Sequence, residues 1–345
     1  MNSKKQYNSA VDVLRILSIL AVVGIHTTTR TLEVSLFALQ KIPFTLFLNQ
    51  IFRFAVPLFF IISGFVLELS FHTNENYLIY LKKRLSRIFI PYVFWSVIYY
   101  FLVYSKNRNP NFLFTLLRGD ASYQLYFIPT LLIFYLIFPF IHKYIKIIGN
   151  IWVIFFLFLI QLFLLFRDYN GQHIQIFYPL AIFLLNYFPF IFGVFISRNF
   201  DMFKKFINKW KLILFLGTII SGYFVFYEGF VGYLTTHNYL TFYSQWKPSV
   251  LIYTMFIGGT FYYLFDRNIF NSFVLKTISK LSFFVFFVHV IILEGMWYLI
   301  GIKIFQLQFA QNLWWDPIYF SAVTLISFFI AYIAHKIPYL SKLTG

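Results

Sequence analysis

Three ionisable residues stand in the first long apolar stretch of the chain: Asp12, Arg15 and His26. On an α-helix, with about 100° and about 1.5 Å per residue, Arg15 and His26 share one face and lie roughly 16 Å apart along the axis. Asp12 falls one turn before Arg15. An imidazole can transfer a proton, and a guanidinium can bind an anionic group. Because ionisable groups inside a bilayer are costly, we interpret this face as functional; the alternative is an interfacial ion pair and an interfacial histidine.

The composition indicates what surrounds these residues. Of 345 residues, 60% are hydrophobic and 11% are charged, and the mean hydropathy is +0.75. One soluble core cannot bury such long apolar runs, so we predict an all-α polytopic membrane bundle forming a single domain over 1–345, with no appended soluble domain. The first helix is expected to be retained, because no cleavage site follows it. The apolar runs predict about ten transmembrane helices, at 10–30, 45–70, 88–105, 124–142, 150–167, 178–197, 211–230, 248–265, 280–301 and 317–336.

The net charge of +17 predicts an orientation in a membrane rather than binding to nucleic acid. With the N-terminus inside, the inner segments hold 18 of the 28 Lys and Arg residues and the outer segments hold 8. This bias, with an even number of helices, predicts a multi-pass protein of the cell membrane with both termini cytoplasmic. Arg15 is then near the cytoplasmic side, and His26 is in the outer half of the first helix.

The chain contains no cysteine, which excludes a thiolate nucleophile, a disulfide framework and a cysteine-based metal site. No pattern predicts a metal site, a P-loop or a dinucleotide fold. Any enzyme chemistry is therefore expected to use oxygen and imidazole groups.

Five segments in order resemble acyltransferase family 3 of membrane proteins. The first is the Asp12-to-His26 stretch, with ten residues between the arginine and the histidine. The others are PLFFIISGFVL at 57–67, YLKKRLSRIFIPYVFW at 80–95, NYFPFIFG at 186–193 and LSFFVFFVH at 281–289. The sequence departs from the family pattern in two places. Phe283 and Phe286 stand where tyrosines are usual, and the segment around Tyr126 lacks a tryptophan.

The resemblance implies an acyl-CoA-dependent O-acyltransferase, with acetyl-CoA as the expected donor and no metal. The expected acceptor is a hydroxyl of a cell-envelope polysaccharide or its lipid-linked precursor, which would make the reaction an O-acetylation. Membrane lipids and the proteins of envelope-polysaccharide biosynthesis are the expected partners. Arg84 and Arg87 would share a helix face and clamp the CoA phosphates, and Lys83 would add positive potential. The alternative for this basic run is topology and lipid contact.

The resemblance also implies roles for the buried polar residues. His26 would take the proton of the acceptor hydroxyl as it attacks the thioester, and Arg53 is a candidate for stabilising the oxyanion. Arg15, held by Asp12, would guide pantetheine or a phosphate. His289 would be a second acid–base group, or a packing residue bonded to Ser63. Ser63 and Gly64 are expected to permit close helix approach.

Two other functions stay open at this stage. The chain would also suit an exporter of a polysaccharide or an acylated intermediate, although the sequence shows no repeated halves or paired broken segments. A membrane relay that hands its acyl group to a separate extracytoplasmic transferase would need a partner protein.

Overall fold

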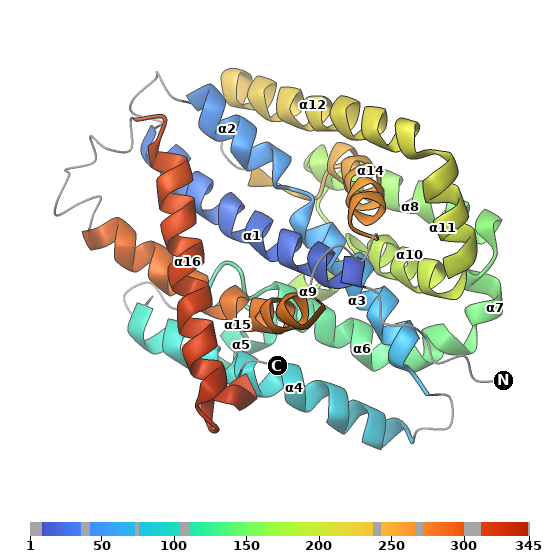
Figure 1. Ribbon diagram of the computed structural model, residues 1–345, viewed down its shortest axis with the longest axis horizontal. Helices are drawn as coiled ribbons and strands as arrows, with labels where there is room; N and C mark the ends of the chain where they lie inside the picture. Colours follow the sequence, from blue (N-terminus) through green and yellow to red (C-terminus); the bar gives the residue numbers. More distant parts are fainter. Residues whose placement is uncertain are drawn as a thin grey trace. The chain divides into compact units, whose positions relative to one another are not determined.

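The computed structural model describes residues 9–35, 42–72, 76–103, 111–236, 243–266, 272–299 and 312–343, and among these it contains helices and no strand (Figure 1). The α-helices are α1 (Ser9–Ser35), α2 (Ile42–Ile51), α3 (Ala55–Ser70), α4 (Tyr77–Ile98), α5 (Phe112–Arg118), α6 (Phe127–Lys143), α7 (Ile145–Ile148), α8 (Ile151–Tyr169), α9 (Tyr178–Leu184), α10 (Tyr187–Arg198), α11 (Phe200–Lys209), α12 (Lys211–Thr236), α14 (Pro248–Phe265), α15 (Ser272–Met296) and α16 (Trp315–Lys336). A short π-helix (Tyr99–Val103) follows α4, and a 3-10 turn (Leu340–Leu343) follows α16.

Seven helical segments in the described residues are long and apolar enough to cross a bilayer, or eight if one bent pair counts as a single span. This confirms an all-helical, multi-pass membrane protein, but it does not confirm the predicted count of ten. The third predicted helix differs because the chain becomes helical earlier: the Asn76 side chain accepts a bond from the Leu78 N–H, and α4 therefore starts at Tyr77. Residues 300 and 301, the end of the ninth predicted helix, lie outside the described residues.

The helix is interrupted within two of the predicted spans, and a proline follows each interruption. The span predicted at 45–70 divides into α2 and α3 around Arg53, and the span at 178–197 divides into α9 and α10 with a 49° bend near Leu185. Each break lies four residues before a proline, Pro57 or Pro189. Proline has no N–H to bond the carbonyl four residues earlier, and its ring crowds that carbonyl. Among the described residues the span at 178–197 is therefore bent, whereas α2 and α3 still form one candidate span from Pro43 to Ser70.

The chain divides into two compact units. The first comprises residues 1–5, 60–204 and 334–345; the second comprises 6–59 and 205–333. In the first unit, glycines bring α3 and α10 into backbone contact. A Cβ added at Gly64 would lie 2.0 Å from the Phe190 carbonyl oxygen, and one at Gly193 would lie 1.9 Å from the Ile61 carbonyl oxygen. The close helix approach predicted at Gly64 is confirmed, and its partner is α10.

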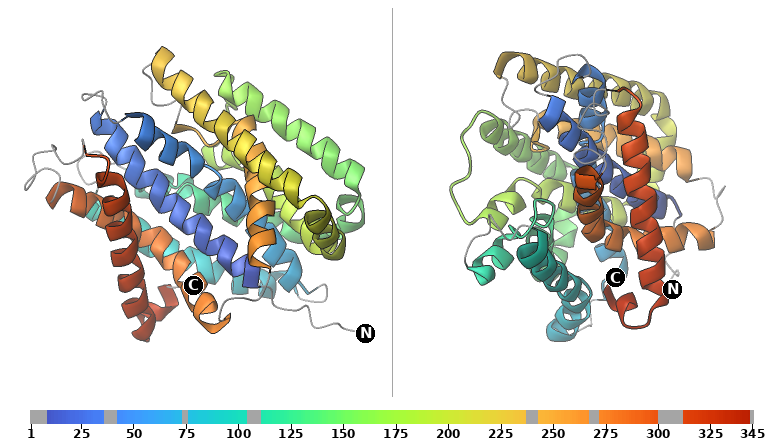
Figure 2. Two further views of the ribbon diagram at one scale, coloured as in Figure 1. Left: turned by 45° about the horizontal axis from the view of Figure 1, so that its top comes forward. Right: turned by 90° about the vertical axis from the view of Figure 1, so that its left-hand side faces the viewer.

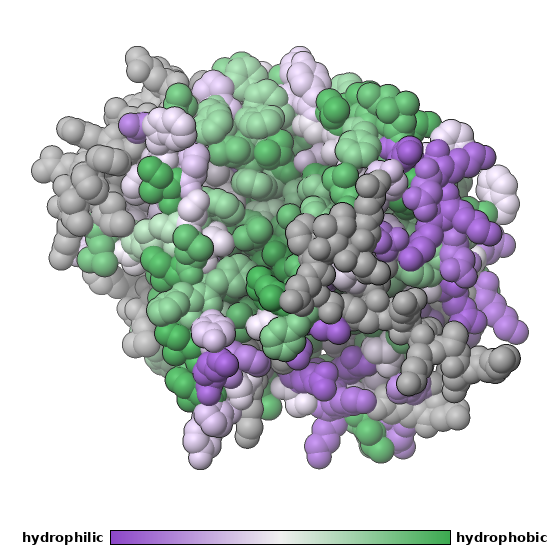
Figure 3. All heavy atoms as spheres, in the orientation of Figure 1, coloured by the Kyte–Doolittle hydropathy of each residue, from purple (hydrophilic) through white to green (hydrophobic). Residues whose placement is uncertain are grey.

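In the second unit, α1 packs against α2, α14 and α15, and α12 packs against α2 and α14. Leu32, Leu46 and Tyr233 join α1, α2 and α12 in a small apolar core. Helices α1 and α15 run side by side in the same direction (Figure 2). Many bulky apolar side chains of the bundle are exposed to the surroundings, as on α8 and α12, and this is expected of helices that face lipid. In the view of Figure 3, green hydrophobic residues cover much of the visible face, and purple hydrophilic residues gather over α11.

Candidate active site

Polar side chains occur at three levels along the parallel pair of α1 and α15. Arg15 contacts Ser279, His26 contacts His289, and Arg30 contacts Glu294. The partners advance together: His26 is eleven positions after Arg15, and His289 is ten positions after Ser279. We call these the first, second and third contacts. Because the two helices keep one register, they hold a line of polar groups through an otherwise apolar interface.

The first contact is a three-residue cluster. The Ser279 hydroxyl donates to Asp12 Oδ1 at 2.6 Å and accepts from Arg15 Nη1 at 3.0 Å. Arg15 Nη1 also lies 3.4 Å from the same Asp12 oxygen. The predicted pairing of Asp12 with Arg15 is thus present, and Ser279 completes it. The other Asp12 oxygen, Oδ2, is buried with no hydrogen-bond partner among the described residues, whereas the Arg15 side chain stays 30% exposed.

The second contact joins the two candidate acid–base groups. The imidazole rings of His26 and His289 stack with their centroids 5.3 Å apart and their planes at 29°. His289 is fully buried, and His26 keeps some accessible surface. His289 Nδ1 lies 3.0 Å from the Val285 carbonyl oxygen. A carbonyl can only accept, so Nδ1 carries the proton and the Nε2 lone pair is left available.

His289 bonds to its own helix through Nδ1, and its Nε2 has no hydrogen-bond partner in the described part of the chain. Buried polar atoms are nearly always paired, and one left unpaired beside a second histidine is a candidate proton acceptor. Phe286 stands where the family usually has a tyrosine, so this position is apolar here. The centroids of the Phe286 and His289 rings lie 6.4 Å apart.

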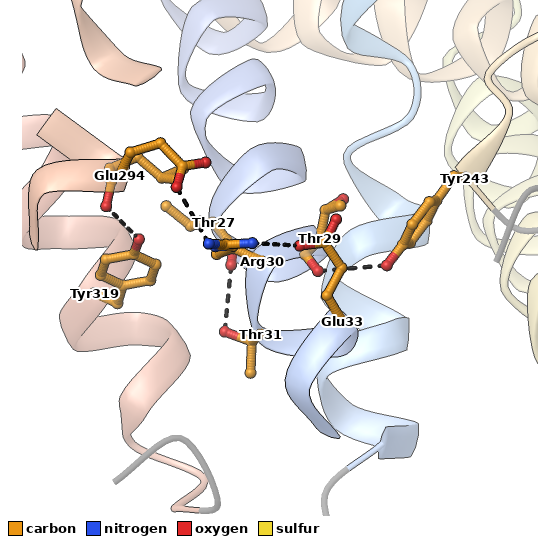
Figure 4. Close-up of polar contacts among 9 residues, drawn as sticks. Thr27, Thr29, Arg30, Thr31, Glu33, Tyr243, Glu294 and Tyr319 are labelled. Carbon is orange, nitrogen blue, oxygen red and sulfur yellow. Dashed lines mark hydrogen bonds and ion pairs between the residues drawn. The ribbon is translucent and has the colours of Figure 1, made fainter. Parts of the chain in front are cut away.

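The third contact lies one helical turn beyond the histidines, and Figure 4 shows Arg30 of α1 facing Glu294 of α15. The Arg30 guanidinium bonds Glu33 on its own helix at 2.9 Å and Glu294 on α15 at 3.3 Å. It also lies over the Trp297 ring, 5.5 Å from the centroid. The Tyr319 hydroxyl donates to the Leu293 carbonyl and so ties α16 to this end of α15. All three charged side chains are partly exposed, so this contact is open to solvent or to a polar ligand.

Arg53 lies at the break between α2 and α3 and is 3% exposed. Its guanidinium donates to the Asn49 side-chain oxygen and to the Tyr243 carbonyl. The Asn49 amide in turn donates to the Ile25 carbonyl at 3.2 Å, directly before His26. The Arg53 charge also acts on the His26 imidazole. Asn49 therefore fixes Arg53 against the helical turn that carries His26.

The basic residues of α4 belong to the first unit. Lys83 and Arg87 are exposed, and Arg84 is half-buried. Arg84 Nη2 donates to the Ser70 hydroxyl at 2.8 Å and to the Ser70 carbonyl at 3.2 Å, so it caps the last turn of α3. Within the same unit, Glu68 contacts His142 Nδ1 at 2.8 Å. Arg84 therefore has a structural contact that the sequence did not indicate, and Arg87 keeps its charge accessible.

Sequence reasoning missed Ser279, Asn49 and the pairing of Glu294 with Arg30. For Ser279 and Glu294 the only signal is the helix register: once Arg15 and His26 are assigned to one face of α1, a parallel neighbour carrying His289 must present residues near 279 and 294 at the same levels. Single-chain periodicity does not reveal which helix is that neighbour. Asn49 gave no signal, because asparagine near a helix end is most often a cap.

Comparison with known proteins adds the family. The model of acyltransferase family 3, described as an acyltransferase domain, matches residues 8–332. The chain is 24% identical over 298 residues to the "Putative membrane-bound acyltransferase YfiQ" of Bacillus subtilis (strain 168), which covers 81% of this chain and 79% of that protein. It is 24% identical over 265 residues to the "Probable poly-beta-1,6-N-acetyl-D-glucosamine export protein" of Staphylococcus aureus (strain N315), with 72% of each chain covered. No solved structure matches the chain. Because the family model spans nearly its whole length, the chain belongs to acyltransferase family 3.

Proposed function

We propose that the protein is an integral membrane O-acyltransferase that moves an acyl group, expected to be acetyl, from cytosolic acyl-CoA to a hydroxyl of an extracytoplasmic or lipid-linked polysaccharide. One observation carries the proposal: in a chain of this family, His26 and His289 stack on two parallel membrane helices, with an available imidazole nitrogen on His289. We take both termini to be cytoplasmic, as the charge bias predicts, so that the first contact would lie toward the cytosol and the third contact toward the outside.

In the proposed reaction a histidine of the pair takes the proton of the acceptor hydroxyl. The freed oxygen attacks the thioester carbonyl carbon, a C–O bond forms, and the carbonyl oxygen becomes an oxyanion. The C–S bond then breaks and the carbonyl reforms. The leaving CoA thiolate takes the proton that the histidine pair has held. The products are an ester and CoA thiol, with no net change in protons.

The donor is proposed to enter from the cytosolic side. The pantetheine arm carries amide N–H groups that Asp12 Oδ2 can accept, and its carbonyls suit Arg15. Arg87 and Lys83 on α4 supply accessible positive charge of the kind that binds CoA phosphates. The polar, partly exposed third contact is suited to a hydroxyl-rich acceptor, because carboxylates accept bonds from hydroxyls and guanidinium donates to them.

Export of a polysaccharide is the second candidate. It is favoured by the printed name of the Staphylococcus aureus relatives and by the bent pair of α9 and α10, since interrupted helices line the substrate sites of many transporters. Export does not require a pair of stacked histidines, whereas acyl transfer requires an acid–base group of this kind. The two functions separate experimentally, because export needs neither thioester cleavage nor CoA release.

The test uses purified, detergent-solubilised protein. Binding of acetyl-CoA and release of CoA thiol are measured for wild type, for His26→Ala and for the double variant Arg84→Ala/Arg87→Ala, with propionyl- and butyryl-CoA as further donors. We expect the His26 variant to bind donor without turnover and the double variant to lose binding. Wild-type protein that neither binds nor cleaves any donor would remove the acyltransferase proposal and leave export as the leading candidate.

A further inference from the structure

Lys247 is a buried lysine that neither the sequence motifs nor the proposed reaction uses. It is the N-cap residue of α14, just before the membrane span that starts at Pro248, and its side chain is 0% exposed. Burying a lysine costs several kcal/mol unless the surroundings compensate it. A structural lysine at a helix end would normally extend to solvent, so its position requires an explanation.

Three contacts fix the segment of Lys247, one each to the break between α2 and α3, to α1 and to α12. The Tyr243 carbonyl accepts a bond from Arg53, and the Tyr243 hydroxyl donates to the Thr29 carbonyl of α1 at 3.4 Å. On the other side of Lys247, the Ser249 hydroxyl donates to Glu228 of α12. Residues 243–249 are therefore fixed on both sides of Lys247, between α1, the α2–α3 break and α12.

The α12 side of this site is also close to the break. A Cβ added at Gly229, the residue after Glu228, would lie 2.6 Å from the Gln50 side chain at the end of α2. The Tyr253 hydroxyl of α14 donates to the Ile51 carbonyl at 3.1 Å. Hence α12, α14 and the end of α2 all meet where Arg53 and Lys247 are buried.

The charges around Lys247 have a definite arrangement. It interacts with the Glu228 carboxylate on α12 and with the Arg53 guanidinium at the break, and Arg53 interacts in turn with His26 on α1. The hydroxyls of Tyr243 and Tyr253 are further titratable groups near the segment. Burial lowers the pKa of Lys247 to about 8. The Glu228 charge raises this pKa, and the Arg53 charge lowers it further. The ammonium form is thus present at neutral pH and is lost within an accessible range.

Two buried cations beside a candidate general base form a site for negative charge. We propose that Lys247 and Arg53 together bind the oxyanion that forms on the thioester carbonyl when the acceptor attacks, an inference that rests on the proposed acyl transfer. Glu228 holds Lys247 in the site and is a positioning residue. In a site closed to water, fixed cations stabilise a developing oxyanion without reorganisation, and one such donor contributes about 100-fold or more to kcat.

The test compares Lys247→Met, Lys247→Arg and wild type in purified full-length protein, with CoA thiol release from acetyl-CoA measured between pH 6 and pH 10. Lys146→Met is the matched control, because Lys146 is an exposed lysine on α7. We expect Lys247→Met to lower kcat about 100-fold with an unchanged KM for acetyl-CoA, and the control to match wild type. Thermal unfolding in detergent identifies a variant that fails to fold.

The pH profile separates this role from a structural one. An ammonium that binds an oxyanion acts below its pKa, so wild-type kcat should fall as the pH rises through about 8. Lys247→Arg stays charged and should retain substantial activity with no such fall. Activity that rises through pH 8, or a Lys247→Met kcat within threefold of wild type, overturns the inference alone. Wild-type protein that releases no CoA overturns the proposed function, and this inference with it.

Discussion

The imidazole rings of His26 and His289 stack 5.3 Å apart, although the two residues are on the first and one of the last long helices of the chain. The stack exists because α1 and α15 run parallel and keep one register from Arg15 to Arg30. His289 is oriented by its Nδ1–H bond to the Val285 carbonyl, which directs the other nitrogen away from its own helix backbone. A pair of this kind can hold a proton while a thioester is attacked.

Removing either imidazole should therefore stop turnover while the donor still binds. We expect His26→Ala and His289→Ala each to lower kcat for CoA thiol release by about 100- to 10,000-fold, the range for a general acid–base group. The affinity for acetyl-CoA, measured by titration calorimetry, should change less than threefold. His173→Ala is the matched control, since His173 is an exposed histidine bonded to Asp168. A His289 variant with full activity would reduce that residue to a packing role.

Ser279 should control how Arg15 is presented to the donor. Ser279→Ala removes the bond to Arg15 and the bond to Asp12, and a hydrogen bond to a charged group is worth about 1.5–3 kcal/mol. We expect the KM for acetyl-CoA to rise about tenfold or more, with kcat changed much less. Ser327→Ala is the control, because Ser327 is also buried in a membrane helix and bonds the Val323 carbonyl. Equal KM values for the two variants would exclude a donor role for the first contact.

The sequence predicted the helical class, and it singled out Arg15, His26 and His289, which the structure places along the interface of α1 and α15. These residues could be singled out because ionisable residues are rare in apolar helices and their spacing can be read directly, and their catalytic roles stay predictions. The partners could not be predicted, because Ser279, Asn49 and Lys247 acquire their roles from neighbouring helices. The breaks at Arg53 and Leu185 were within reach of the sequence, four residues before Pro57 and Pro189, but apolar run length alone concealed them.

The backbone contact of α3 and α10 predicts a sharp dependence on glycine. Gly64→Ala places a methyl group 2.0 Å from the Phe190 carbonyl oxygen, so the two helices must separate. Overpacking of this kind costs about 1–3 kcal/mol. We expect a clear decrease in the thermal unfolding temperature in detergent, or loss of the folded protein. Gly295→Ala on α15 is the control, because a Cβ there meets nothing within 4 Å. Equal unfolding temperatures for both variants would show that α3 and α10 are not in backbone contact.

Substitution of Arg84 should affect the stability of the protein, whereas substitution of Arg87 should affect binding of the donor. Arg84 bonds Ser70 at the end of α3, so Arg84→Ala leaves that helix end uncapped and should lower the unfolding temperature. Arg87 is exposed, and Arg87→Ala should leave the unfolding temperature unchanged. If Arg87 binds a CoA phosphate, its removal should weaken acetyl-CoA binding about five- to tenfold and reduce the dependence of binding on salt, since screening acts on that charge pair. Lys205→Ala, on exposed α11, is the control for a general loss of positive charge. Equal binding by Arg87→Ala and Lys205→Ala, at low and at high salt, would assign the basic run of α4 to topology and lipid contact instead.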